Sequence, residues 1–146
     1  MSIFVDETET FPITIYYKQV KDEIGNLLYT DVSPEQCDGW EILTCKFCQP
    51  SAGIFSDILE QATVVNSYSH KPVLRTRMLR DLILFLLMKE WSVVNENGQM
   101  IPICEDSIRL MDIKVANLLF IEYIKTTKLT AVLKAVIRDE RSDKGS

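Results

Sequence analysis

Glycine and histidine are too scarce in this chain for the common sequence motifs of enzymes. Five glycines are spread over 146 residues, and they do not form the glycine-rich loop of a P-loop or of a dinucleotide-binding site. The single histidine, His70, lies in the polar stretch 66–71, and no serine or cysteine stands in the sequence context of a catalytic nucleophile. We therefore expect no catalytic residue, no cofactor and no metal, and we predict that the chain is not an enzyme.

Basic residues are too few for a protein that binds duplex nucleic acid. The chain has 16 lysines and arginines against 21 acidic residues, which gives a net charge of −5, whereas binding to a duplex needs a concentrated basic surface. The one local basic cluster consists of Arg75, Arg77 and Arg80, and Asp81 follows it directly. We expect no nucleic-acid partner.

Long hydrophobic runs are also missing. The run Leu82–Met88 has seven apolar residues, whereas a membrane-spanning helix needs roughly 20. The N-terminal sequence MSIFVDETETF is acidic, while a signal peptide begins with a basic region and an apolar stretch. We therefore expect no membrane partner, and we expect the cysteines to face a reducing cytoplasm.

The four cysteines leave one chemical alternative open. Cys45 and Cys48 have the C-x-x-C spacing of redox and zinc sites, which place the pair on a tight turn or at a helix start. Here the pair lies in a predicted strand, where an offset of three points the two side chains to opposite faces. A zinc site would also require Cys37 together with Cys104 or His70. We interpret the cysteines as small buried residues, and zinc bound through Cys45 and Cys48 remains the alternative.

The residues that are present predict an α+β fold. A chain of this length with 47% hydrophobic and 25% charged residues is typical of one globular domain, which buries roughly 70% of the surface of its unfolded form. Alternating β-branched and aromatic residues predict strands over residues 11–20, 27–32 and 40–48. We predict that residues 1–50 form an antiparallel β-hairpin or a three-stranded sheet.

After Pro50 the apolar spacing changes to three and four residues, which predicts about four to five helices. The expected helices span residues 52–65, 72–91, 104–111, 113–124 and 129–138. Ser51 and Asp112 are expected caps, and Asn95–Gly98 is an expected turn. We predict that residues 51–138 pack with the β region as one domain, and that residues 139–146 form a flexible tail.

The predicted helix over residues 72–91 has more apolar surface than one covered side requires. Its expected main face is formed by five residues, Leu74, Met78, Leu82, Phe85 and Met88. Further apolar side chains make its C-terminal half apolar nearly all round, which is typical of a helix covered on more than one side, by its own domain or by another chain. Tryptophan is also enriched among the energetically dominant residues of protein interfaces. We therefore predict partner binding by five residues, Leu79, Ile83, Leu86, Leu87 and Trp91.

The order of elements from Trp40 onward resembles a group of bacteriophage proteins. A strand with the sequence WEILTCKF is followed by Pro-Ser and a helix, and a long helix ends in KEW at Trp91. The polar turn NENG precedes the sequence IPI, and an acidic-capped segment then leads into VANLL. This pattern covers about two thirds of the chain. It is similar to small tail-assembly proteins of tailed bacteriophages, which include tail-assembly chaperones and baseplate-assembly proteins.

The resemblance implies a non-enzymatic morphogenesis factor that binds structural proteins of a phage tail or baseplate in the host cytoplasm. It implies no ligand-binding residues, because such proteins are not defined by a chemical site. Two alternatives remain open. The chain is either a chaperone that leaves before the particle is complete, or a permanent adaptor subunit of the virion tail, baseplate or connector. The adaptor would bind its neighbours or copies of itself as a homo-oligomer.

Overall fold

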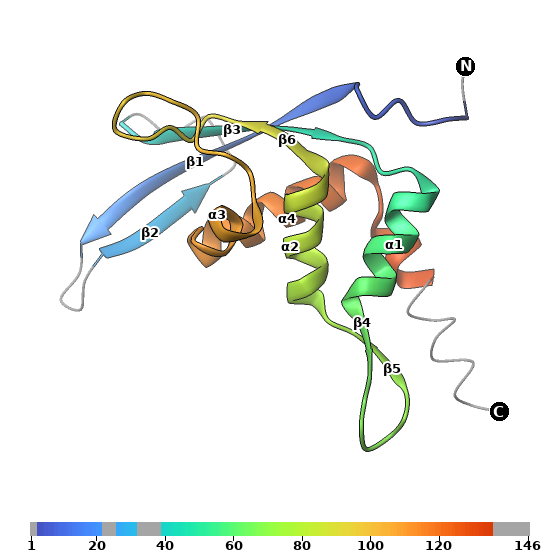
Figure 1. The fold of residues 1–146 in the computed structure, drawn as a ribbon. Helices are drawn as coiled ribbons and strands as arrows, with labels where there is room; N and C mark the ends of the chain where they lie inside the picture. The colour runs from blue at the N-terminus through green and yellow to red at the C-terminus, as the bar shows by residue number, and fades with distance from the viewer. Residues whose placement is uncertain (1–2, 22–25, 32–38, 136–146) are drawn as a thin grey trace.

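The chain forms an α+β fold in which helices cover one face of an antiparallel sheet (Figure 1), so the predicted fold class is confirmed. The computed structural model describes residues 3–21, 26–31 and 39–135, and the tail predicted at 139–146 lies outside these ranges. The sheet has the strand order β2-β1-β3-β6, with β1 (Thr10–Lys21), β2 (Asn26–Asp31), β3 (Glu41–Cys48) and β6 (Met88–Trp91). The helices are α1 (Ala52–Ala62), α2 (Thr76–Leu87), α3 (Glu105–Arg109) and α4 (Ile113–Thr127), and residues 130–135 are again helical. A two-stranded hairpin joins β4 (Thr63–Val65) to β5 (Pro72–Leu74).

The centre of the sheet follows the alternation predicted for its strands. Strands β1 and β3 are antiparallel neighbours, with Ile13 opposite Cys45 and Ile15 opposite Leu43. These four side chains and that of Phe47 are buried, because alternate residues of a strand point to the same face. This face is the one against which the helices pack.

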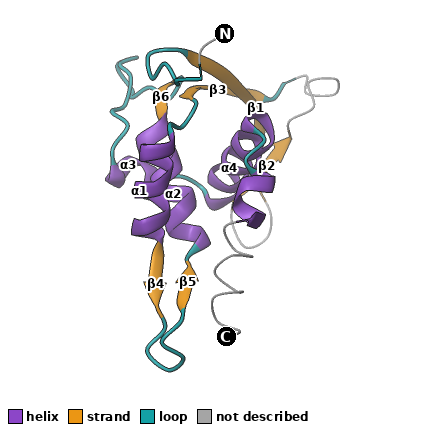
Figure 2. Cartoon of the chain, turned by 90° about the vertical axis from the view of Figure 1, so that its right-hand side faces the viewer, coloured by secondary structure: helices purple, strands orange, loops and turns teal. Residues whose placement is uncertain are grey.

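The helix predicted over residues 52–65 ends at Ala62, and a hairpin follows it. Val64 pairs with Val73 and Val65 with Pro72, so the prediction that Pro72 begins a helix is wrong. β-branched residues favour extended backbone where they can pair. The Arg75 N–H donates to the Ala62 carbonyl at 2.8 Å and closes the base of the hairpin, which projects away from the helices (Figure 2).

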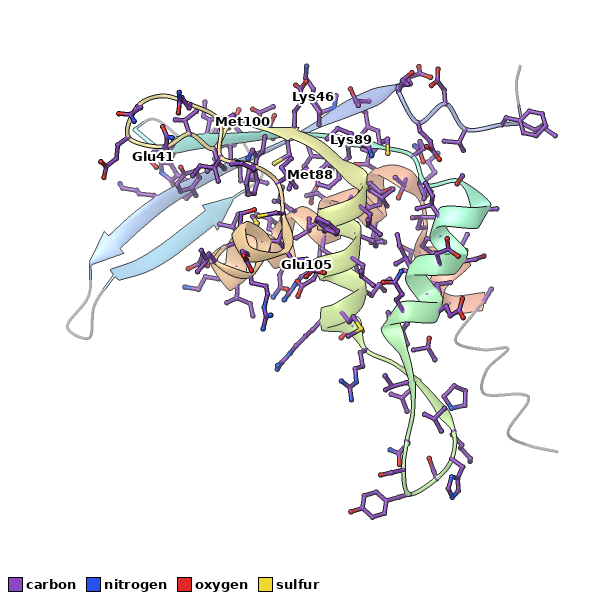
Figure 3. The ribbon with its side chains drawn as sticks, in the orientation of Figure 1. Glu41, Lys46, Met88, Lys89, Met100 and Glu105 are labelled. Carbon is purple, nitrogen blue, oxygen red and sulfur yellow. The ribbon has the colours of Figure 1, made fainter. Side chains whose placement is uncertain are left out.

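The helix predicted to run to Trp91 ends at Leu87, and strand β6 takes up its last residues. Trp91 lies opposite Cys45 and Met88 opposite Phe47, so a fourth strand joins the three that were predicted. Pairing with β3 satisfies backbone groups at the sheet edge, and such tertiary contacts override local helix preference. The exposed side of this pairing has an ion pair between Lys46 and Glu90, with Nζ and Oε2 3.4 Å apart; Figure 3 shows Lys46 on that side.

One hydrophobic core joins the sheet to the helices. Tyr123 on α4 is completely buried, and its hydroxyl donates to the Cys48 carbonyl at 3.0 Å. The Tyr123 ring lies 5.1 Å from that of Phe47 and 5.9 Å from that of Phe11, measured between centroids. Helix α4 is capped by Asp112 as predicted, because its carboxylate accepts from the Lys114 N–H at 2.8 Å. In the described part of the chain, no helix combines the length and the apolar character needed to cross a membrane.

Candidate functional site

Four of the five residues predicted to bind a partner lie in the core of their own chain. Leu79, Ile83 and Leu87 on α2 are at most 2% exposed, and Trp91 on β6 is 6% exposed. Leu86 is partly buried against the same core. A partner could reach the four buried side chains only if the core opened. Their burial assigns them to folding and leaves the other side of α2 as its accessible surface.

Trp91 holds the connection between β6 and α3. Its indole Nε1–H donates to the Ile101 carbonyl at 2.6 Å, and the Ile101 N–H donates to the Val93 carbonyl at 3.0 Å. Between these contacts lies the predicted turn Asn95–Gly98, which is confirmed by the Gly98 N–H bond to the Asn95 carbonyl at 3.0 Å. Trp91 thus makes its hydrogen bond and its strand pairing within its own chain.

The C-x-x-C cysteines are buried, as the interpretation of them as small core residues predicts. Cys45 is completely buried and Cys48 is 1% exposed, and both are free thiols. Burial raises the pKa of the Cys45 thiol to about 12, which keeps it protonated and poorly suited to bind metal. Cys104 is exposed at the start of α3, His70 is exposed in the turn between β4 and β5, and Cys37 lies outside the described residues. Within the described residues, no group of three His, Cys, Asp or Glu side chains could hold a metal.

A groove with a volume of about 850 Å³ opens between α2 and α3 and extends to the end of β5. We call it the α2–α3 groove. Its apolar lining comes from both helices and from the hairpin, and consists of Leu74, Met78, Leu82, Phe85 and Ile108. Met78 is 39% exposed, while Leu82 and Phe85 are partly buried. The groove therefore presents part of the apolar surface of α2 to solvent, next to side chains that also pack against the core.

Charged side chains line the same groove, and they are Arg75, Arg77, Arg109, Asp81 and Glu105. The three arginines are exposed, and no carboxylate of the described residues forms an ion pair with any of them. Glu105 lies at the first turn of α3, close to α2 (Figure 3). The groove thus combines apolar surface with guanidinium groups that are available to an anionic partner.

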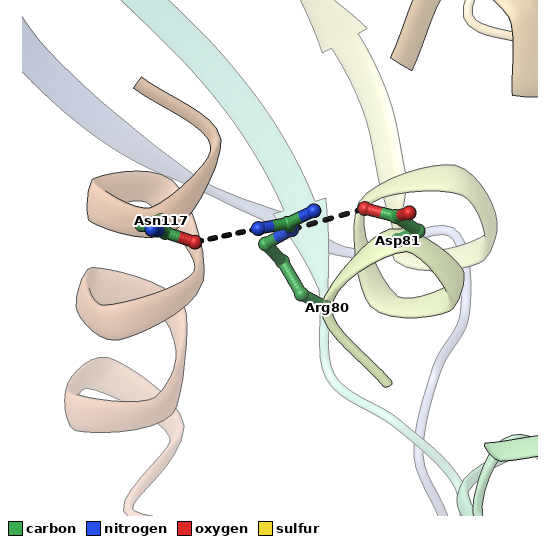
Figure 4. Close-up of polar contacts among 3 residues, drawn as sticks. All are labelled: Arg80, Asp81 and Asn117. Atoms are coloured by element: carbon green, nitrogen blue, oxygen red, sulfur yellow. Dashed lines mark hydrogen bonds and ion pairs between the residues drawn. The ribbon is translucent and has the colours of Figure 1, made fainter. Parts of the chain in front are cut away.

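Arg80, the third arginine of the cluster seen in the sequence, makes internal contacts instead. Its Nε donates to Asp81 Oδ1 at 3.0 Å, and its Nη1 donates to Asn117 Oδ1 at 2.7 Å (Figure 4). The Arg80 side chain is 14% exposed. It joins α2 to α4 and neutralises the Asp81 carboxylate, so that Arg75, Arg77 and Arg109 face the single remaining carboxylate of Glu105 in the groove.

The start of α2 departs from the usual residue preferences of a helix N-terminus. Arg75 is the N-cap residue, its side chain makes no capping hydrogen bond, and the first turn has no acidic residue. Two arginines, Arg75 and Arg77, thus lie near the positive end of the helix dipole, where cations are unfavourable. By contrast, Ser51 and Asp112 cap α1 and α4. Local departures of this kind are common where a residue serves binding rather than folding.

The sequence indicated part of this site but assigned it a different role. Leu74, Met78, Leu82 and Phe85 were predicted to lie on one apolar face of a helix; all four line the groove, although Leu74 lies on β5 and not in the helix. The residue that completes the arginine cluster, Arg109, was missed. It comes from α3, and its position depends on the packing of α3 against α2, for which the sequence gives no local signal.

Comparisons of the chain with protein-family models, with curated proteins and with solved structures give no match.

Proposed function

We propose that the chain is a non-enzymatic assembly factor that binds a structural protein of a phage tail or baseplate through the α2–α3 groove. The observation that supports a binding role is the combination, in one groove, of solvent-facing apolar surface and arginines that form no ion pair within the described part of the chain. Methionine, aromatic residues and arginine are enriched at the centres of protein interfaces. Met78, Phe85 and Arg77 supply this combination here.

The groove suits an extended or helical segment that has both acidic and apolar side chains. Leu82 and Phe85 offer a floor for apolar side chains, since their burial by a partner removes further apolar surface from water. An arginine forms two parallel hydrogen bonds with a carboxylate, so Arg75, Arg77 and Arg109 would fix the register of such a segment. In this mechanism the chain covers an assembly-prone segment of its partner in the host cytoplasm until the partner enters the particle.

A permanent adaptor subunit is the second candidate, and the β4–β5 hairpin favours it. The hairpin projects from the helices (Figure 2), with Tyr68 95% exposed and Val65 67% exposed. Large apolar side chains on a projecting hairpin suit a contact that persists in an assembled structure. The adaptor and the chaperone differ in whether the chain stays in the finished particle.

Site-specific cross-linking in the source system tests the proposal. A photoreactive residue replaces Leu82 in the groove, and in a matched control it replaces Lys134, which is exposed outside the groove. Adducts are identified by mass spectrometry during particle assembly. The proposal expects a tail or baseplate protein cross-linked from position 82 and not from position 134. Absence of any such adduct overturns it.

Quantification of the chain in lysate and in purified particles then separates the two candidates. A chaperone gives adducts in lysate and is missing from particles. An adaptor is present in several copies per particle and remains cross-linked there.

A further inference from the structure

We propose that the α2–α3 groove of one copy binds the segment of residues 3–9 of a second copy, so that the chain associates head to tail. This inference rests on the proposed function in one respect, which is that the groove is a protein-docking site. It adds an identified occupant whose chemistry is present in the chain itself.

The segment that precedes β1 is exposed throughout and combines apolar with acidic residues. Ile3 is 92% exposed and Phe4 is 82% exposed. The acidic residues Asp6, Glu7 and Glu9 follow them, and the segment has no basic residue. Exposure of two large apolar side chains beside each other is unfavourable in water, and burial against a partner removes that apolar surface from water.

The composition of this segment complements that of the groove. Leu82 and Phe85 provide apolar surface for the Ile3–Phe4 end, and the arginines provide counter-charges for the acidic end. The three arginines of the groove have no ion pair among the described residues, and the carboxylate of Asp81 is already paired with Arg80. Opposite charges that meet at an interface select the partner and set its register.

The positions of the two surfaces favour association between copies. In both views the segment before β1 lies at the end of the molecule formed by the sheet, whereas β5 and the start of α2 lie at the opposite end (Figures 1 and 2). A contact between two different surfaces at opposite ends of a molecule is heterologous. Such a contact produces a ring where the rotation closes, and an open filament where it does not.

Charge-reversal variants of the full-length chain test this arrangement. Arg77→Glu removes the groove's affinity for the acidic segment, and Glu7→Lys removes the segment's affinity for the groove. Sedimentation equilibrium of the wild-type chain in low salt is expected to give a mass that rises with concentration above the monomer mass of 16.8 kDa. Each variant is expected to weaken association about tenfold or more, because like charges then face each other. The matched control Lys134→Glu, a charge reversal outside the groove, leaves association unchanged.

Mixing the two variants gives the decisive measurement. The Arg77→Glu chain keeps an intact segment that binds the intact groove of the Glu7→Lys chain, and its altered groove meets the altered segment of that chain with the charges exchanged. A head-to-tail contact therefore predicts that a one-to-one mixture associates again, although neither variant does so alone. The double variant Arg77→Glu/Glu7→Lys is expected to regain self-association, since the charges are exchanged. A wild-type chain that stays monomeric, or association that neither variant alters, overturns the inference. In that case cross-linking of a phage structural protein from position 82 would still uphold the proposed function, so the two failures are distinguishable.

Discussion

The two sides of helix α2 differ in what covers them. On one side, Leu79, Ile83 and Leu84 are at most 2% exposed and pack into the core of their own chain. On the other side, Met78 and Leu82 line a groove that remains open. Both sides are rich in large apolar residues, so composition alone does not reveal which one is available. Packing against the sheet and α4 decides it.

Truncation of matched leucines gives the largest expected contrast between the two sides. Leu84→Ala is expected to lower the free energy of unfolding by about 2–5 kcal/mol, because it leaves a cavity in a close-packed core. Leu82→Ala is expected to cost about 1 kcal/mol, since Leu82 is only partly buried and little cavity forms. Urea denaturation of both variants measures the difference. Equal losses would show that the groove side is as fully packed as the core.

The core against which the buried side of α2 packs also contains Cys45 of β3, whose contribution to stability depends on pH. Burial raises the pKa of the Cys45 thiol from 9.0 to about 12, so above pH 9 the unfolded chain loses this proton while the folded chain keeps it. The stability due to the neutral thiol is therefore complete below pH 9 and is lost as the pH rises towards 12. The expected loss is about 1.4 kcal/mol per pH unit in that window.

Comparison with Cys45→Ala isolates this contribution. Urea denaturation at pH 8 and pH 10.5 should show a decrease in unfolding free energy that is about 2 kcal/mol larger for the wild type than for Cys45→Ala. Cys104→Ala, at an exposed thiol, is the control and should keep the loss of stability above pH 9, because it leaves Cys45 buried. An equal pH dependence for Cys45→Ala and wild type would contradict the burial of this thiol.

The sequence could predict the elements that depend on interactions between residues close in the chain, but not those that depend on distant residues. Strands β1 and β3 were predictable because their alternation of apolar residues and the Pro and Gly residues that bound them are local signals. The end of α2 was not, because Met88–Trp91 becomes a strand by pairing with β3, which is distant in the sequence. The arginine cluster was predicted as Arg75, Arg77 and Arg80. Its spatial form depends on Asn117 of α4, which binds Arg80, and on α3, which supplies Arg109.

Arg80 joins α2 to α4 and also pairs with Asp81, which lines the groove. Its replacement should therefore affect both the stability of the chain and binding in the groove. Arg80→Gln removes the contacts with Asp81 and Asn117, and the expected loss of unfolding free energy is about 1–2 kcal/mol, since both partners are partly solvated. It also leaves the Asp81 carboxylate unpaired in the groove, which should weaken binding of an acidic segment. Denaturation together with sedimentation equilibrium measures the two effects. Lys134→Gln is the matched control, and a variant that loses stability without any change in association would contradict the electrostatic link.

The smallest expected effect concerns the start of α2 and has the opposite sign. Arg75→Ser introduces a side chain that caps the helix and removes a cation from the positive end of its dipole. We expect the free energy of unfolding to rise by about 0.5–1 kcal/mol. The same change removes one of the three groove arginines, so association or partner binding should weaken. A stabilised chain that binds less well would show that Arg75 is retained for binding at the expense of folding.

Lys128→Gly separates this interpretation from a general effect of stability on binding. Lys128 ends α4 in the left-handed conformation, with φ of 59°, which glycine adopts without a steric penalty. The substitution should therefore stabilise the chain by about 1 kcal/mol, comparable to Arg75→Ser, and it leaves the groove intact. If both variants are stabilised and only Arg75→Ser binds less well, the local cost at the start of α2 belongs to the groove. If both bind equally well, the arginine at the N-cap has no part in binding, and the open side of α2 depends on its apolar residues.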